Sequence, residues 1–221
     1  MKLRSTWQLV LVMVCAWGSA SSAQRLAGEE ADVRAVLAAY RAAIQSKDGA
    51  AALGAVSQGS VDFFGTVLQR ALTGGKAEIL KMSAPAQFLV LRTRLEFADA
   101  RLETLGPAEF YVKTVNAGWT PARSVADWEL GSLTFTGNRA TAPLVLRGKP
   151  LPNVVYGFAK DGGKWKVDLT PLFSQVDTGV RAAVDEAGRD KTKTLLAALA
   201  RVTGKPVTDS VWEPLRKPEK P

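Results

Sequence analysis

The sequence DGGKWKVDL at residues 161–169 closes a longer stretch, residues 127–171, that decides the fold. Within it, apolar residues alternate with polar ones: Trp165, Val167 and Leu169 against Lys164, Lys166 and Asp168. Successive side chains of a strand point to opposite faces of a sheet, so this alternation predicts a strand with one buried face. The DGGK sequence at 161–164 contains residues that tolerate positive φ and predicts a tight hairpin turn.

Three further alternating series precede this strand. Their apolar positions are Trp128, Leu130, Leu133 and Phe135, then Ala140, Ala142, Leu144 and Leu146, then Val154, Tyr156 and Phe158. The first series changes phase at Gly131-Ser132, which predicts one inserted residue, as in a β-bulge. Residues 136–138 predict a second tight turn, whereas 147–152 contains two prolines and predicts a longer loop. We therefore predict a four-stranded antiparallel meander.

Amphipathic helices are predicted on both sides of this sheet, because apolar residues there recur at three- and four-residue spacing. Asp48 and Ser60 are the predicted N-caps of two of them, and Gly188 and Gly204 are predicted helix stops. Helices, then strands, then helices is the order of an α+β fold. The predicted helices span residues 29–46, 48–56, 61–72, 76–82, 84–105, 107–115, 174–187 and 190–202.

The N-terminus has the three parts of a secretory signal peptide. Lys2 and Arg4 precede an apolar run at 9–17, and the small residues 18–23 follow it. We predict cleavage between Ala23 and Gln24, and a location in the periplasm or outside the cell. The apolar run is shorter than the about 20 residues that span a bilayer, and no later run approaches that length, so no transmembrane segment is expected.

An anchored lipoprotein is the alternative for this N-terminus. It would use Cys15, but the preceding Val14 is bulkier than the residue that such processing favours, so anchoring is not expected. The mature chain is then expected to form one α+β domain at 24–215 with a disordered tail at 216–221. Its three parts are a helical part at 24–118, the sheet at 119–171 and a helical extension at 172–215, in which Trp212 and Leu215 pack back on the body.

The composition excludes several kinds of catalysis. The chain has no histidine, and its one cysteine, Cys15, lies in the predicted signal peptide. The mature chain therefore has no Ser-His-Asp or Cys-His nucleophile, no imidazole base and no zinc site built from His or Cys. Only oxygen ligands remain for a metal, and the acids are not clustered, so we expect no metal and no cofactor. Gly74-Gly75-Lys76 lacks the Ser or Thr that a P-loop requires and predicts a helix stop.

The candidate pocket residues are Trp128, Tyr156 and Asp168. The two aromatic residues lie in strand phase, so they either line a pocket or fill the core. Asp127, Glu129 and Asp168 are the carboxylates nearest the sheet. Two carboxylates facing each other across a pocket could perform acid–base chemistry, whereas solvated charges on a strand face are the simpler interpretation. We assign no catalytic residue.

The charge balance favours acidic partners. Without the signal peptide, which carries Lys2 and Arg4 and no acid, 27 of the 29 Lys+Arg remain against 21 Asp+Glu. This excess favours weak contact with anionic envelope polymers. A basic face is one possibility, but no interleaved aromatic residues or nucleic-acid module accompany it, so we expect a solvated helix face and no nucleic-acid partner. Its residues would be Arg92, Arg94, Arg101, Lys113 and Arg123.

The first helices and the sheet carry a family resemblance. The helix at 29–46 is followed by KDGAAAL at 47–53, and the sheet contains GNRATA at 137–142 and GGKWKVD at 162–168. This combination resembles the nuclear transport factor 2-like (SnoaL-like) superfamily, and more narrowly uncharacterised exported bacterial proteins of that type. The resemblance implies a curved sheet wrapped on helices into a cone, whose mouth is an enzyme pocket in some relatives and a binding or assembly surface in others. The extra helices at 59–118 and after 171 depart from compact members, and no catalytic role is transferred to a residue here.

Two functions follow from these observations. The first is an exported, non-catalytic binding or assembly module whose partner is a small hydrophobic ligand or an envelope protein. The alternative is a histidine-free enzyme in which Asp168 or Asp127 acts as general base on a small hydrophobic substrate. A homodimer formed through the sheet face is a further possibility.

Overall fold

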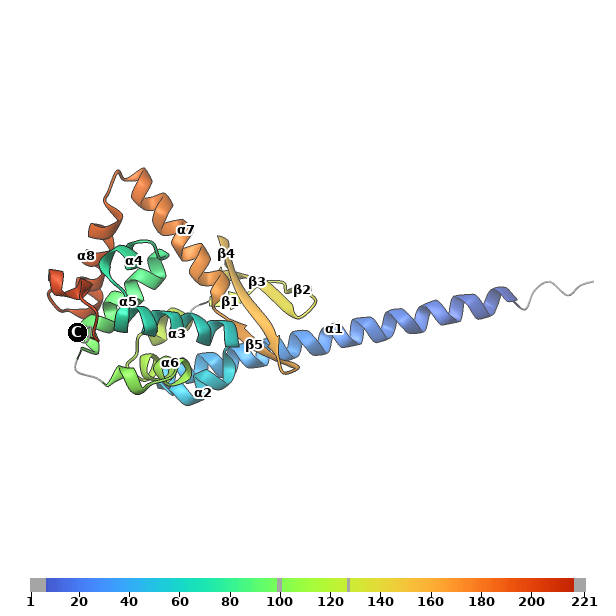
Figure 1. The fold of residues 1–221 in the computed structure, drawn as a ribbon. Coiled ribbons are helices and arrows are strands. Elements are labelled where there is room, and N and C mark those ends of the chain that lie inside the picture. The colour runs from blue at the N-terminus through green and yellow to red at the C-terminus, as the bar shows by residue number, and fades with distance from the viewer. Residues whose placement is uncertain (1–6, 99–100, 127, 217–221) are drawn as a thin grey trace, which may run out of the picture.

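The computed structural model describes residues 7–98, 101–126 and 128–216, and its helices, sheet and C-terminal helices confirm the α+β fold (Figure 1). The N-terminal helices are α1 (Trp7–Ser46), α2 (Gly49–Ala55), α3 (Gln58–Thr73), α4 (Lys76–Leu80), α5 (Ala84–Glu96) and α6 (Pro107–Asn116). The C-terminal helices are α7 (Thr170–Glu186) and α8 (Lys191–Thr203). Short 3₁₀ helices lie at η1 (Leu102–Thr104), η2 (Ala122–Val125) and η3 (Asp209–Trp212).

α1 is longer than the predicted helix at 29–46, because it begins at Trp7, inside the predicted signal peptide. Its N-terminal part extends away from the rest of the chain (Figure 1). The later part contributes Val33, Leu37 and Ile44 to the buried core, so cleavage after Ala23 would leave these contacts in place. No helix within the described residues combines the length and the apolar character that crossing a membrane requires.

The sheet is a curled antiparallel meander in which the first strand is interrupted. β1 (Trp128–Leu130) and β2 (Thr134–Thr136) pair with the same strand, β3 (Arg139–Leu146). Leu130 lies opposite Leu144, and Thr134 lies opposite Thr141. Between these pairs, the three residues 131–133 face the two residues 142–143 of β3. This is the single inserted residue that the phase change predicted.

The remaining strands complete the meander, and here one prediction was wrong. β4 (Lys149–Asp161) pairs with β3 and with β5 (Lys164–Asp168). Residues 147–152 are not a loop, because Arg147 and Gly148, both at positive φ, form a two-residue turn and β4 begins directly after it. The prolines lie instead before and within a bulge at 151–154, where the register shifts and Asn153 adopts a φ of 60°.

The cap of α2 is confirmed and that of α3 was misplaced. Asp48 Oδ1 accepts a hydrogen bond of 2.9 Å from Ala51 N, as an N-cap does. The cap of α3 is Ser57, whose Oγ accepts from Ser60 N. Ser60 is buried in the first turn, and its Oγ accepts a hydrogen bond of 2.9 Å from Leu169 N, so it joins α3 to the end of β5.

The helix predicted at 84–105 ends early. α5 stops at Glu96, where Phe97 leaves helical geometry and its ring stacks on Trp119 with centroids 5.1 Å apart and planes 9° apart. The apolar spacing continues because Leu102, in η1, is fully buried. Burial of a loop side chain therefore produced the same pattern as a helical face.

The C-terminal segment packs on the body as predicted. Trp212 is buried, and Leu215 N donates a hydrogen bond of 3.2 Å to Ala71 O, at the end of α3. Arg216 N donates to Leu72 O at 2.9 Å, so the first residue of the predicted tail is attached. Residues 217–221 lie outside the described residues.

Candidate functional site

A cavity of about 580 Å³ lies between the concave side of the sheet and the helices that cover it. Among the residues that the structure describes, none that lines the cavity is charged, and three of them are tyrosines. The lining consists of Tyr40, Phe64, Leu89, Tyr111, Thr114, Val115, Trp119, Thr120, Pro121, Val125, Trp128, Leu144, Leu146, Leu151, Tyr156, Leu169, Leu172 and Phe173. Pro121 and Leu146 are exposed to solvent, so the cavity opens beside them.

The three tyrosines come from three elements. Tyr40 lies on the buried face of α1, Tyr111 on that of α6, and Tyr156 on the inward phase of β4. Burial raises the pKa of Tyr40 to about 12, and it also raises the pKa values of Tyr111 and Tyr156 well above their ordinary range. All three phenols are therefore neutral at physiological pH and act as hydrogen-bond donors or acceptors rather than as bases.

Two lining residues carry buried polar groups that lack a hydrogen-bond partner in the described structure: the Tyr111 hydroxyl and the indole Nε1 of Trp119. Interaction with Tyr40 contributes to the raised pKa of Tyr111, but no hydrogen bond of normal distance and angle joins the Tyr111 hydroxyl to another described residue. A buried polar group without a partner costs about 1–3 kcal/mol. These two groups are consequently the least satisfied part of the cavity wall.

An arginine supports the wall near Tyr156. The guanidinium carbon of Arg41 lies 4.0 Å from the ring centroid of Trp128, and Arg41 donates a hydrogen bond to the Trp128 carbonyl oxygen. The rings of Trp128 and Tyr156 have centroids 4.8 Å apart. Burial lowers the pKa of Arg41, which still remains a cation at neutral pH. The positive charge thus lies behind the aromatic wall rather than in the cavity.

Of the three candidate pocket residues, Trp128 and Tyr156 line the cavity and Asp168 does not. Asp168 Oδ1 accepts hydrogen bonds from the Thr170 hydroxyl at 2.7 Å and from Thr170 N at 3.1 Å, and Oδ2 lies 3.3 Å from Arg139. These bonds fix the start of α7. Glu129 is exposed, and Asp127 lies outside the described residues.

The expectation of a solvated helix face was wrong for two of the five residues, because Arg92 and Arg94 are buried, and the alternative of a basic face does not form either. Arg94 is 4% exposed and donates to the carbonyl oxygens of Ala71 at 3.0 Å and Arg70 at 2.9 Å. Arg92 is 8% exposed, with its guanidinium carbon 4.6 Å from the Trp119 ring centroid. Arg101 is exposed, and the Arg123 side chain lies outside the described part. Both buried arginines stabilise the packing of α5.

Sequence reasoning missed Tyr40, Tyr111 and Trp119 as site residues. Tyr40 and Tyr111 lie within the predicted helices at 29–46 and 107–115, but no pocket role was predicted for either residue. These residues could have been recognised by their polar atoms. A Tyr or Trp that is predicted to be buried brings an O–H or N–H group into the interior, and that group usually requires a hydrogen-bond partner.

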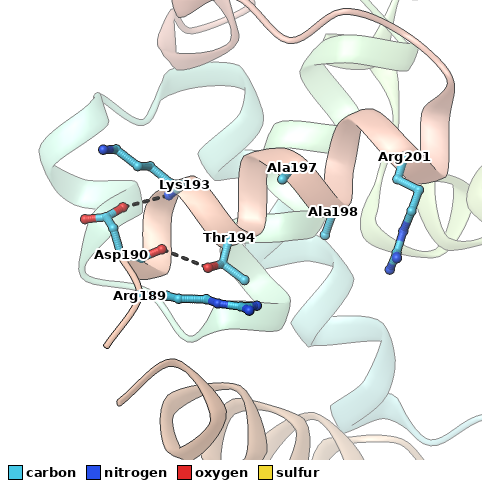
Figure 2. A pocket seen from close by; sticks show the side chains of 7 residues that line it. All are labelled: Arg189, Asp190, Lys193, Thr194, Ala197, Ala198 and Arg201. Atoms are coloured by element: carbon cyan, nitrogen blue, oxygen red, sulfur yellow. Dashed lines mark hydrogen bonds between the residues drawn. The ribbon is translucent and has the colours of Figure 1, made fainter. Parts of the chain in front are cut away.

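A second hollow, of similar size, lies on the outer side of α8 (Figure 2). Arg189, Lys193 and Arg201 surround two alanines of the helix, Ala197 and Ala198. Asp190 Oδ1 accepts a hydrogen bond of 2.7 Å from Lys193 N and so caps the helix. Within the described chain, none of the three cations takes part in an ion pair.

No cluster of three or more His, Cys, Asp or Glu side chains suited to a metal occurs in the residues that the structure describes. No protein-family model, no curated protein and no solved structure matches the chain. The architecture is an α+β cone with an aromatic cavity whose described lining residues are uncharged, and a function has to be argued from that geometry.

Proposed function

We propose that the protein is an exported, non-catalytic binding module of nuclear transport factor 2-like type that holds a small, mainly apolar ligand in the cavity. The observation that carries this proposal is the uncharged cavity of about 580 Å³ with two buried donors in its wall. Cavities of about 300–1,000 Å³ lined by apolar and aromatic side chains with a few polar groups are typical of small-molecule sites.

The unsatisfied donors indicate the polarity of the ligand. Tyr111 O–H and Trp119 Nε1–H are both available to donate, and the second can only donate. A ligand atom that accepts a hydrogen bond from one of them removes the cost of leaving it without a partner. The ligand is therefore mainly apolar and carries at least one acceptor, such as a carbonyl or ether oxygen.

The alternative, a carboxylate-dependent enzyme, has less support. Asp168 already accepts hydrogen bonds that fix α7 and lies away from the cavity, and no described lining residue is charged. The phenols are poor bases at neutral pH because burial raises their pKa values. A general base near the operating pH is thus missing from the described wall.

A matched pair of probes tests the proposal. Acetophenone and ethylbenzene have similar size and shape, but only acetophenone carries a hydrogen-bond acceptor. We expect both to bind the purified protein in isothermal titration calorimetry. Replacing Tyr111 with Phe should weaken acetophenone by about three- to tenfold and leave ethylbenzene within about twofold. If neither molecule binds at millimolar concentration, the cavity is not a ligand site and the proposal is wrong.

We also propose that the α8 hollow is where the protein makes weak contact with anionic envelope polymers. Lys193 and Arg201 are eight residues apart on one helix, which corresponds to a rise of about 12 Å. Cations at such spacing, without ion-pair partners, suit a repeating anionic chain better than one small anion.

A further inference from the structure

A groove of about 640 Å³ lies outside the cavity, between β4 and α7. As in the cavity, the lining residues that the structure describes are all uncharged. Its walls are formed by the bulge of β4 on one side and by one face of α7 on the other. The lining consists of Pro152, Asn153, Val154, Leu172, Ser174, Gln175, Val176, Thr178, Gly179 and Ala182.

The groove and the cavity share a wall. Leu172, in the first turn of α7, lines both of them. On the opposite side, Leu151 lines the cavity and the next residue, Pro152, lines the groove. The two hollows are thus separated by the thickness of a few side chains, at a place where the β4 bulge is not paired with β3.

The groove is built into the fold by a side chain. The amide of Gln175 accepts a hydrogen bond of 2.7 Å from Val155 N and donates one of 3.0 Å to Val155 O. It therefore takes the place of a neighbouring strand at this edge of β4 and fixes α7 against the sheet. Because these bonds hold both walls, the groove is present without a ligand.

The groove face of α7 is uncovered. Val176 is 43% exposed, and a Cβ added at Gly179 would meet nothing within 4 Å. α7 leaves the sheet and runs toward α8 (Figure 1), and from Leu172 to Ala182 it advances about 15 Å. This face combines the apolar Leu172, Val176 and Ala182 with the polar Ser174, Gln175 and Thr178, so it offers apolar contact beside groups that can form hydrogen bonds.

We infer that the ligand of the cavity is an elongated amphiphile, with its acceptor-bearing end in the cavity and a flexible apolar chain crossing Leu172 to lie along α7. This inference rests on the proposed binding function and adds the shape of the ligand. Its basis is the shared Leu172 wall, the uncharged lining on both sides and the preformed, uncovered groove. A compact ligand would fill the cavity and leave the groove unused.

Straight-chain alcohols provide the test, because their apolar length varies while the polar end stays the same. Hexanol, octanol, decanol and dodecanol are titrated into the purified protein. We expect the affinity to increase through the whole series, by about two- to fourfold for each methylene. Val176→Glu places a charge in the groove and should weaken dodecanol by about tenfold or more while leaving hexanol within about twofold.

Val202→Glu is the matched control, because Val202 is also an exposed helical valine, 52% exposed, and is not part of the groove. It should leave all four affinities unchanged. Affinity that stops increasing at octanol, or equal effects of the two substitutions, would refute the elongated ligand while leaving a compact ligand possible. Binding by neither alcohols nor acetophenone would remove the proposed function as well. If the wild type is a dimer by light scattering and Val176→Glu makes it a monomer, a second copy occupies the groove and the inference is wrong.

Discussion

Glu29 and Trp165 join the first helix to the last strand through a direct hydrogen bond. Trp165 Nε1 donates to Glu29 Oε2 at 2.9 Å, and Lys160 Nζ lies 2.7 Å from the other carboxylate oxygen. The indole itself is 5% exposed and packs edge-on against Phe135, with ring centroids 5.6 Å apart. The strand that decides the fold is therefore attached to α1 by both packing and polar contacts.

Replacing Trp165 with Ala should largely unfold the protein. Truncating a buried Trp typically costs about 3–5 kcal/mol, against a total stability of about 5–15 kcal/mol. Trp165→Phe keeps much of the apolar contact and loses the hydrogen bond, so it should cost less than half as much. Thermal melts by circular dichroism compare the three proteins. A melting temperature for Trp165→Ala within a few degrees of wild type would contradict the buried position.

The contribution of Glu29 should depend on pH. Hydrogen bonds from Lys160 and Trp165 hold the pKa of Glu29 below its ordinary value of 4.5. A carboxyl group whose pKa is lower in the folded state stabilises the fold above its unfolded pKa, and loses that effect as the pH falls through the folded pKa. Glu29→Gln should therefore lower the melting temperature at pH 7, and this difference should shrink below about pH 4.5. A difference that is the same at pH 7 and pH 3 would show that the charge has no role.

The sheet could be predicted because its signal is local. Alternation identified the strands, and one change of phase at Gly131-Ser132 located the inserted residue between β1 and β2. The loop prediction at 147–152 was wrong because Pro150 and Pro152 were interpreted as loop residues, whereas a bulge also accommodates proline. Alternation in the sequence shows that a segment is a strand, but it does not show where packing against the rest of the fold introduces a bulge.

The site was less predictable, because it is formed by long-range contacts. Tyr111 lies 71 residues after Tyr40 and 45 residues before Tyr156, and the three meet only when α1, α6 and β4 pack together. The end of α5 has the same origin, since the stacking of Phe97 on Trp119 competes with a helical pattern that runs past it. Trp128 and Tyr156 were named because they lie in strand phase, and Asp168 in the same stretch turned toward α7 instead.

Arg94 should be required for stability even though no carboxylate among the described residues pairs with it. Its guanidinium donates to the carbonyl oxygens of Arg70, Ala71 and Gly74 at the end of α3, and burial lowers its pKa to about 10. Arg94→Met removes these charge-assisted hydrogen bonds, although Gly74 N still donates to Arg70 O and Leu215 N to Ala71 O, and should cost about 3 kcal/mol in chemical denaturation. Arg70→Met is the control, because it removes only an exposed ion pair to Glu78 and should cost less than about 1 kcal/mol. Equal losses would show that the carbonyl contacts contribute nothing.

Tyr111→Phe should not destabilise the ligand-free protein. The hydroxyl lacks a hydrogen-bond partner in the described structure, so its removal eliminates a buried polar group while keeping the ring. We expect the free energy of unfolding to be unchanged or increased by about 1 kcal/mol. Tyr40→Phe is the comparison, because the Tyr40 hydroxyl interacts with Tyr156 and should be worth about 1 kcal/mol. A clear loss of stability in Tyr111→Phe would mean that its hydroxyl has a partner, such as a bound water.

The α8 hollow should dominate binding to polyanions. A double charge reversal, Lys193→Glu with Arg201→Glu, removes the two cations that lie about 12 Å apart along one helix face. This variant should elute from immobilised heparin at a clearly lower salt concentration than wild type. Its two cations, which attract the polyanion, have become anions that repel it, so less salt is needed to screen the remaining attraction. The control is Arg147→Glu with Lys164→Glu, which makes the same change in net charge at two exposed hairpin turns. If both variants elute at the same salt concentration, net charge alone governs retention and α8 is not a specific contact surface.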